Sequence, residues 1–308
     1  MSEMSLAERA QNAVEDLQDR ICAALEGVEE RSGGGARFVE DAWERPGGGG
    51  GRTRVLADGA VLEKAGVNTS AVHGELPEVM RERLPGEGDA FFATGVSLVL
   101  HPKNPNAPTT HANFRYIQRG ETGWFGGGAD LTPFVLYEDD ARHFHAELAA
   151  ACDAYDPEFY PRFKAWCDRY FYLPHREEAR GIGGVFFDWV RPDDAHDLDA
   201  LFDWWRAIGE AFLPAYLPIL ERRKAVPFDD ALRTWQLVRR GRYVEFNLLH
   251  DRGTKFGLQT AGRIESILMS LPPLVRWDYG VPVAEGSPEA RLLEVLRDPV
   301  DWLGRGEG

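Results

Sequence analysis

Apolar residues alternate with polar residues in several short segments of the chain and recur with helical spacing in longer ones. Alternation with β-branched and aromatic residues predicts strands at residues 54–57, 60–64, 91–101, 112–118, 184–190 and 242–249. Helical spacing predicts helices at residues 140–154, from Asp156 onward, at 198–213 and at 261–271. The strands come mostly early and in neighbouring pairs, and Asp58-Gly59 between the first two is a hairpin signal.

This order of elements predicts an α+β (mixed α/β) fold, with one large, mostly antiparallel sheet that is covered by helices on both faces. A regular alternation of strand and helix, which would indicate a parallel sheet, is missing from the pattern. The chain has 308 residues, of which 44% are hydrophobic, and this is ample for a large core. We therefore expect residues 1–308 to form a single catalytic domain.

The first 30 residues predict an acidic amphipathic helix. Ser5 and Glu8 have the spacing of a capping box, and apolar residues then follow at helical intervals. This segment lacks the hydrophobic core of an export signal. The longest apolar run, residues 91–100, is shorter than the roughly 20 residues that a membrane-spanning helix needs. We expect a cytoplasmic protein without integral membrane association.

Charge and cysteine content narrow the classes of partner. The formal net charge of −15 argues against nucleic acid and anionic membrane, which both require a basic surface. A small anionic substrate stays possible, because a few local arginines decide its binding once distant charges are screened. The three cysteines, Cys22, Cys152 and Cys167, form no CxxC pair, so we expect core packing and no disulfide framework.

Candidate chemistry is concentrated between residues 91 and 131. A predicted strand ends at His101-Pro102, and the next strand carries Asn113 and Arg115 on one face because side chains alternate along a strand. His111 shares that face if the strand begins early, and Asp130 follows three consecutive glycines. An imidazole, a guanidinium and a carboxylate suit the roles of an acid, a carboxylate clamp and a base. Spacing alone leaves open that these residues only satisfy loop backbone groups.

Long motifs in the chain resemble those of the aerobic, oxygen-dependent coproporphyrinogen-III oxidase family. The matching text includes HPKNPNAPTTHANFRYI, WFGGGADLTP, YPRFKAWCDRYFYLPHREEARGIGGVFFDW and RRGRYVEFNLLHDRGTKFGLQTAGRIESILMSLPPLVRW. The similarity covers most of the chain after about Asp41. It implies oxidative decarboxylation of two propionates of coproporphyrinogen III to vinyl groups, which gives protoporphyrinogen IX in haem biosynthesis. Molecular oxygen would be the oxidant and co-substrate, without an organic cofactor.

The resemblance also implies roles for individual residues. His111 matches the proposed proton donor, and Asp130 matches an acidic residue at the centre of the macrocycle. The residues that match substrate contacts are Ser97, Asn113, Phe114, Arg115, Ala261, Gly262 and Arg263. Ala261 departs from the family pattern, in which glycine is common. Arginines such as Arg115 and Arg263 suit bidentate binding of the four carboxylates of the substrate.

Two further expectations rest on the same resemblance. Residues 243–278 match the region associated with a homodimer, and the alternating segment 243–249 fits a strand that packs across an interface. Four histidines, His101, His111, His145 and His175, match positions of possible divalent-metal ligands. Their wide spacing gives no compact metal motif, and the alternative is that His145 and His175 form hydrogen bonds within the fold.

Two other classes of function stay open at this point. A tetrapyrrole carrier would need the arginines and an apolar pocket, but it would not need His111 together with Asp130. A metal-dependent hydrolase would use the histidines, although its usual HExxH motif is missing from the chain.

Overall fold

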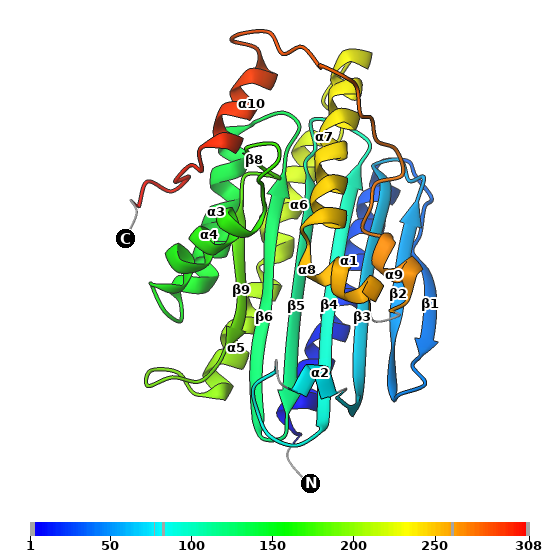
Figure 1. Ribbon diagram of the computed structural model, residues 1–308. Helices are drawn as coiled ribbons and strands as arrows, with labels where there is room; N and C mark the ends of the chain where they lie inside the picture. Colours follow the sequence, from blue (N-terminus) through cyan, green and yellow to red (C-terminus); the bar gives the residue numbers. More distant parts are fainter. Residues whose placement is uncertain (1–3, 77, 82–83, 260–261, 306–308) are drawn as a thin grey trace.

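One antiparallel sheet of seven strands organises the protein in the computed structural model, which describes residues 4–76, 78–81, 84–259 and 262–305 (Figure 1). In spatial order its strands are β1 (Val39–Glu44), β2 (Gly49–Ala57), β3 (Leu62–Glu75), β4 (Ala90–Pro102), β5 (Thr109–Arg119), β6 (Thr122–Thr132) and β9 (Gly184–Val190). Every neighbouring pair is antiparallel. The short strands β7 (Tyr172–Leu173) and β8 (Glu178–Ala179) form a separate hairpin.

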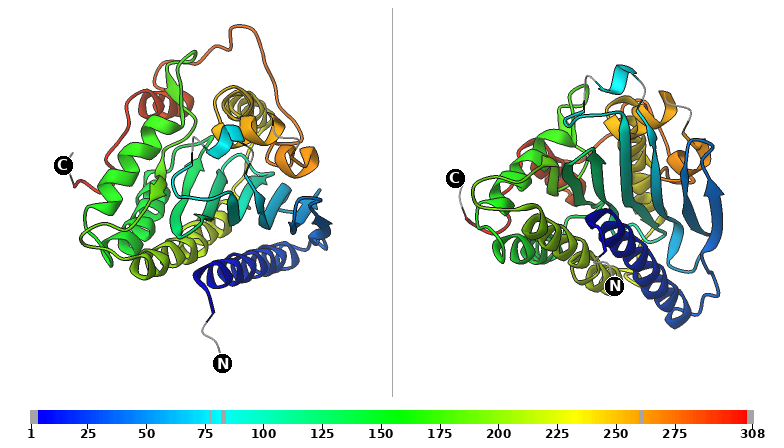
Figure 2. Two further views of the ribbon diagram at one scale, coloured as in Figure 1. Left: turned by 60° about the horizontal axis from the view of Figure 1, so that its bottom comes forward. Right: turned by 90° about the horizontal axis from the view of Figure 1, so that it is seen from below.

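Helices cover both faces of the sheet, as the hydrophobic pattern predicts (Figure 2). The helices are α1 (Leu6–Arg31), α2 (Glu78–Arg81), α3 (Glu138–Asp153), α4 (Phe159–Tyr170), α5 (Leu198–Glu210), α6 (Phe212–Arg223), α7 (Asp230–Leu249), α8 (Arg252–Gln259), α9 (Ile264–Leu268) and α10 (Pro288–Arg297). Helices α1 and α5 lie on one face, which we call the core face, and α7, α8 and α9 lie over the opposite face. The predicted α+β class is confirmed.

Helix α1 shows how the local sequence sets the core face. Ser5 and Glu8 form both hydrogen bonds of a capping box, which satisfies backbone N–H groups at the start of the helix. The apolar side chains Val14, Ile21 and Leu25 are fully or almost fully buried, and α1 contacts β3, β4 and β5. Burial of this apolar stripe fixes the helix against the sheet.

The prediction of a strand at residues 242–249 is wrong, because these residues form the last turns of α7. The helix begins after Asp229, whose side chain accepts a hydrogen bond from the backbone N–H of Leu232. Tyr243, Val244, Phe246 and Asn247 are all buried. When a helix is buried on more than one side, its apolar residues are not confined to one helical stripe. Over so short a stretch, their spacing does not distinguish a buried helix from a strand.

The predicted helix at 198–213 is two helices. The first of these, α5, ends at Glu210, and the second, α6, starts at Phe212. Pro214 has no N–H to bond the carbonyl group four residues earlier, so a continuous helix would lose a hydrogen bond there. The predicted helix at 261–271 is shorter in the structure, where α9 spans Ile264–Leu268. Within the described residues no helix is long and apolar enough to cross a membrane.

Candidate functional site

Strand β5 places its polar side chains on the face of the sheet opposite α1. In the register of the sheet, His111 pairs with Asp130 of β6, and Asn113 pairs with Ser97 of β4. Directly paired residues lie on the same face of an antiparallel sheet. His111, Asn113, Arg115 and Asp130 therefore share one surface, which we call the site face. This confirms the shared face that the sequence predicts.

Asp130 lies at the buried end of this surface and contacts two cationic or protonatable groups. Its side chain is 3% exposed, its Oδ1 lies 2.7 Å from Nδ1 of His111, and both oxygens accept hydrogen bonds from Arg180 at 2.9 and 2.7 Å. Burial opposes ionisation of this carboxyl, but the charge of Arg180 and the bonds from His111 and Arg180 outweigh it. The pKa of Asp130 is consequently lowered from its ordinary value. Asp130 is a carboxylate at neutral pH.

Arg180 is fixed by an aromatic cage behind Asp130. Its guanidinium carbon lies 4.1 Å from the ring centre of Phe171, 4.6 Å from that of Tyr243 and 4.9 Å from that of Phe246. Arg180 also donates a hydrogen bond of 2.9 Å to Oδ1 of Asn247. The rings stabilise the buried cation through cation–π attraction, and the cage leaves its guanidinium little freedom to move. Arg180 therefore holds Asp130 in one orientation.

A chain of polar contacts runs outward from His111 along β5. Asn113 Nδ2 lies 3.4 Å from Nε2 of His111, and Asn113 Oδ1 accepts a hydrogen bond of 2.8 Å from Arg115. Arg115 also forms an ion pair of 2.8 Å with Asp188 of β9. The side chain of Arg115 is 32% exposed, so the chain of contacts leads from a buried carboxylate to a guanidinium that solvent reaches.

Glycines flatten the sheet beside these polar groups. Gly95 and Gly126 pair with Arg115, and Gly128 pairs with Asn113, so all three lie where a side chain would project from the site face. A Cβ at Gly126 would lie 2.8 Å from both Nε of Arg115 and Oδ1 of Asp188, so a larger residue would displace the ion pair. With no side chain at these three positions, a bound molecule can approach the backbone of the sheet closely.

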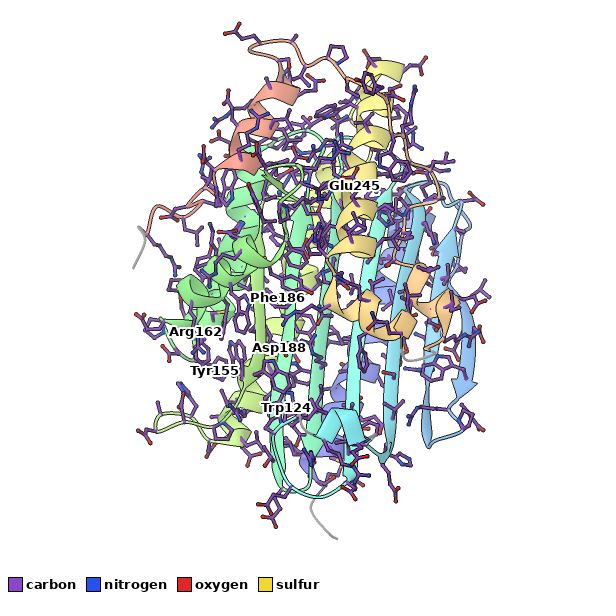
Figure 3. All side chains as sticks on the ribbon, viewed as in Figure 1. Trp124, Tyr155, Arg162, Phe186, Asp188 and Glu245 are labelled. Atoms are coloured by element: carbon purple, nitrogen blue, oxygen red, sulfur yellow. The ribbon has the colours of Figure 1, made fainter. Side chains whose placement is uncertain are left out.

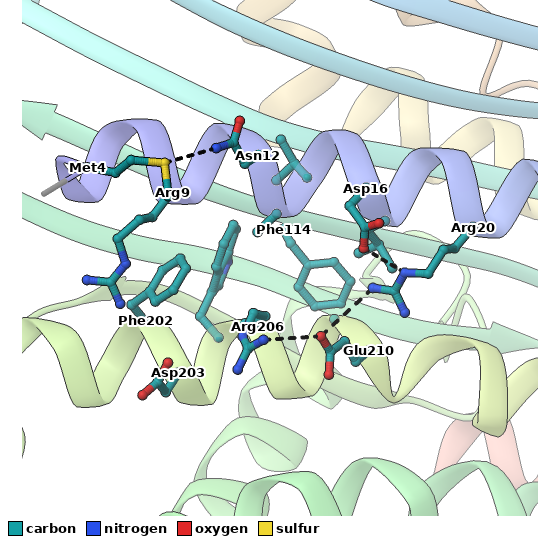
Figure 4. Close-up of a pocket in the computed structure, with 15 residues that line it drawn as sticks. Met4, Arg9, Asn12, Asp16, Arg20, Phe114, Phe202, Asp203, Arg206 and Glu210 are labelled. Atoms are coloured by element: carbon teal, nitrogen blue, oxygen red, sulfur yellow. Dashed lines mark hydrogen bonds and ion pairs between the residues drawn. The ribbon is translucent and has the colours of Figure 1, made fainter. Parts of the chain in front are cut away.

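Phe114 is the predicted contact that lies away from the site face. Its side chain is 1% exposed on the core face, where it lines a hollow of about 430 Å³ between α1 and α5 (Figure 4). Leu17, Phe202 and Trp205 line the same hollow. Only the backbone of Phe114 lies between Asn113 and Arg115, so its side chain belongs to the core.

The structure brings Ser97 to the site face but does not bring Arg263 to Arg115. Ser97 is exposed and pairs with Asn113. Arg263 is the N-cap residue of α9 and forms an ion pair with Asp41 of β1, from which β2, β3 and β4 separate β5. The N–H of Gly262 donates to the carbonyl oxygen of Gly257. Ala261 lies outside the described residues.

The four histidines do not form one cluster. Both ring nitrogens of His101 have partners, namely Thr109 Oγ1 and the carbonyl oxygen of Ser270, and those of His145 contact Tyr160 and the carbonyl oxygen of Ile182. His175 bonds Glu245 and His250, far along the chain from His111. The described part of the chain contains no group of three or more His, Cys, Asp or Glu residues able to hold a metal ion. These residues do not fit a shared metal site, and we derive no step through one.

Burial explains the state of the two buried histidines. Desolvation lowers the pKa of His145 to about 4, and desolvation together with the charge of Arg240 lowers the pKa of His101 well below its ordinary value. Both imidazoles are neutral at pH 7 and serve as hydrogen-bonding groups of the fold. This is the structural alternative that the sequence left open for His145.

The motifs between residues 91 and 131 do not indicate three further residues of the site. Arg180 follows β8, Asp188 lies in β9, and Arg252 begins α8, so all three are far from β5 in the sequence. Arg252 lies 3.9 Å from Oδ2 of Asp188, and its guanidinium carbon lies 4.9 Å from the ring centre of Tyr170. One signal was available for Arg180. A buried carboxylate such as Asp130 requires a cationic partner, and the segment 176–180 supplies two arginines.

The fold and the site together define an α+β enzyme with a flat, glycine-lined surface, a buried carboxylate and arginines for anionic groups. The family described as Coproporphyrinogen III oxidase matches residues 9–302. The chain is also 51% identical over 321 residues to "Oxygen-dependent coproporphyrinogen-III oxidase" of Synechococcus sp. (strain CC9605), covering 96% of this chain and 88% of that protein. This chain belongs to the coproporphyrinogen III oxidase family, which confirms the resemblance seen in its motifs.

Proposed function

We propose that this protein catalyses the oxygen-dependent decarboxylation of two propionate groups of coproporphyrinogen III, giving protoporphyrinogen IX. The observation that carries the proposal is the ionised Asp130 at the buried end of a polar surface that ends in Arg115. The family membership and the name of the 51% identical relative supply the substrate and the oxidant. The step belongs to haem biosynthesis.

Asp130 faces the macrocycle in this proposal. One acceptor position on Oδ2 remains for a pyrrole N–H, because His111 and Arg180 occupy Oδ1 and Arg180 takes one position on Oδ2. The negative charge of Asp130 stabilises positive charge that develops as the ring loses electrons. Arg180 keeps the carboxylate ionised and in place, so no reorganisation is needed during the reaction. Arg115 binds a propionate at the open end of the site.

The electron balance of each step is fixed by the chemistry. The propionate loses carbon dioxide, one proton and two electrons, and the β-carbon–hydrogen bond breaks as the vinyl double bond forms. Oxygen accepts these electrons together with the released proton and one further proton from solvent. Over both steps the four electrons reduce either two O2 to hydrogen peroxide or one O2 to two molecules of water. Two such steps convert two propionates.

Asp130 orients the imidazole of His111 for this chemistry. The ionised Asp130 holds a proton on Nδ1 of His111, which leaves Nε2 toward Asn113 and the substrate side. A role of His111 as proton donor to the substrate requires a proton on Nε2 as well. Ser97 and Asn113 supply further hydrogen bonds on the same face.

An oxygen-controlled assay tests this function against the carrier and hydrolase alternatives. Coproporphyrinogen III is incubated with the purified protein with and without oxygen, and protoporphyrin fluorescence is measured after oxidation of the product. We expect product only with oxygen, and oxygen uptake and hydrogen peroxide release that together account for four electrons per product. Product without oxygen, or binding without product, would contradict the proposal.

We further propose that the protein is a homodimer that works in the cytoplasm. Exposed large apolar side chains collect in the predicted interface segment, which the structure shows as the end of α7, α8, α9 and the loop after α9; they include Leu248, Leu249, Leu258, Ile264, Leu274 and Trp277. Such a patch is typical of an interaction surface. The free, buried Cys22, Cys152 and Cys167 suit a reducing compartment.

The mass in solution tests the dimer. Sedimentation of the wild-type protein should give twice 34.5 kDa. Ile264→Glu places a charge in the patch and should shift the protein toward monomer. Val39→Glu, at an exposed residue of β1 outside the patch, is the control and should leave the mass unchanged. A monomeric wild-type protein would contradict the dimer and leave the proposed reaction untouched.

A further inference from the structure

Asp188 lies at the outer end of the site, where it contacts two arginines from different elements. Its Oδ1 lies 2.8 Å from Arg115 of β5, and its Oδ2 lies 3.9 Å from Arg252 of α8. The carboxylate is 13% exposed, so it is largely withdrawn from solvent. Figure 3 shows Asp188 between Phe186 and Trp124 on the same side of the molecule as α8.

The backbone around Asp188 is irregular in a way that aims this side chain. Phe125 pairs with Val190 and Gly127 pairs with Phe187, so β9 has one more residue than β6 between these pairs. This is a β-bulge, and bulges redirect side chains beside functional sites. Trp189 in the bulge has a φ of 57°, a left-handed conformation that is strained for a non-glycine residue.

Contacts on both sides of the bulge hold this conformation. The backbone N–H of Trp189 donates to Oδ1 of Asp188 at 3.1 Å, and the Trp189 ring stacks on Trp124 with centroids 5.3 Å apart. Gly126 provides the space in which the carboxylate meets Arg115. Solvent reaches the Arg115 side of this ion pair, which is 32% exposed, so the pair is partly screened and does not by itself account for a strained backbone.

The consequence for Arg115 is that both ends of its guanidinium are held. One terminal nitrogen donates to Asn113 Oδ1, and the other contacts Asp188. A guanidinium has five N–H donors in a fixed plane, so two fixed contacts set the direction of the remaining ones. Because two arginines share one carboxylate, the group also keeps one net positive charge for an incoming anion.

We propose that Asp188 is a positioning residue that orients Arg115 to bind a carboxylate of the substrate. This role rests on the proposed function and deepens it. Asp188 acts through Arg115, so it governs substrate affinity more than the rate of the chemical step. Without the charge of Asp188, the Arg115 side chain samples other rotamers. Substrate binding must then order this side chain, which costs conformational entropy and weakens the affinity.

A double-mutant cycle with Asp188→Asn and Arg115→Gln tests the proposal. KM for coproporphyrinogen III and the affinity for the redox-inert coproporphyrin III, followed by tryptophan fluorescence quenching, are measured for all four proteins. We expect Asp188→Asn to raise KM roughly 5- to 10-fold with kcat within about 2-fold, and Arg115→Gln to raise KM further. The double variant should match Arg115→Gln alone, and Asp188→Glu should recover part of the affinity.

Asp140→Asn is the matched control, because Asp140 also joins two arginines, Arg222 and Arg223, away from β5. It should leave KM unchanged. Additive effects of Asp188→Asn and Arg115→Gln, or a fall in kcat with constant KM, would overturn the role of Asp188. If Asp188→Asn unfolds, Asp188→Glu carries the same comparison. Loss of the proposed function is distinguishable, since the wild-type protein would then show no turnover at all.

Discussion

The two faces of β5 show how one strand serves two purposes. On the core face, Ala112, Phe114 and Tyr116 are buried among apolar side chains of α1, α5 and β6. On the site face, His111, Asn113 and Arg115 are each partly exposed and joined by polar contacts. Adjacent residues of one strand thus contribute either to stability or to chemistry, and a one-residue shift in register would exchange them.

The core face and the site face of β5 also differ in how they contribute to the stability of the protein. The core face gains stability from area removed from water, at roughly 25 cal/mol per Å² of apolar surface. The site face buries Asp130 and Arg180, and burial of ions costs free energy unless each partner is present. Substitutions on the site face should therefore affect turnover, whereas those on the core face should affect stability alone.

Arg180→Gln should give the largest effect on stability. It leaves the Asp130 carboxylate buried without its cation, and breaking such a pair costs about 3–5 kcal/mol. We expect turnover to fall as well, measured at a temperature and urea concentration where the variant stays folded. Arg239→Gln is the control, because Arg239 forms an equally buried pair of 2.7 Å with Glu178 outside the site. Equal loss of turnover in both variants would mean that only packing matters.

The decrease in the free energy of unfolding at acid pH should depend on His145. Its pKa is about 4 in the folded protein and 6.5 in the unfolded chain, so the unfolded chain binds a proton that the folded protein excludes. The stability from this group is present above pH 6.5 and is lost as the pH falls to 4, by about 3 kcal/mol in total. Urea unfolding of His145→Gln should show a correspondingly smaller loss between pH 7 and 4. An unchanged pH dependence, or loss of turnover that added zinc or manganese restores, would contradict a purely structural His145.

Phe114→Leu should give the smallest effect. The substitution keeps an apolar side chain on the core face and should cost about 1–2 kcal/mol of stability. KM for coproporphyrinogen III should stay at the wild-type value, since only the backbone of residue 114 belongs to the site face. A raised KM with unchanged stability would show that the Phe114 side chain contacts the substrate after all.

The sequence was sufficient for the antiparallel class of the sheet and for the strand that carries most of the site, although β1 and β6 were not predicted as strands. Alternation along residues 112–118 places Asn113 and Arg115 together, and the hairpin at Asp58-Gly59 joins β2 to β3. In both cases neighbouring residues decide the structure. The site residues that β5 supplies could be predicted for the same reason. Strand β6 was not predicted, because its three consecutive glycines weaken the strand pattern, and Asp130 was indicated by the family motif instead.

Contacts between distant segments could not be predicted in this way. Arg180 meets Asp130 across 50 residues, and Asp188 meets Arg115 only because of a bulge in β9. Residues 242–249 alternate like a strand, but tertiary burial on several sides makes them helical. The ion pair between Arg263 and Asp41 joins residues 222 positions apart and was likewise not predicted, while the role of Arg263 as a substrate contact stays a prediction.

The central claim is that the buried carboxylate of the site face stabilises the reacting macrocycle. The direct test is turnover of Asp130→Asn, which keeps the size of the side chain and removes its charge. We expect kcat to fall about 100- to 1,000-fold, the range for loss of a preorganised electrostatic contact, while affinity for coproporphyrin III changes much less. Near wild-type turnover by the folded Asp130→Asn protein would contradict the account.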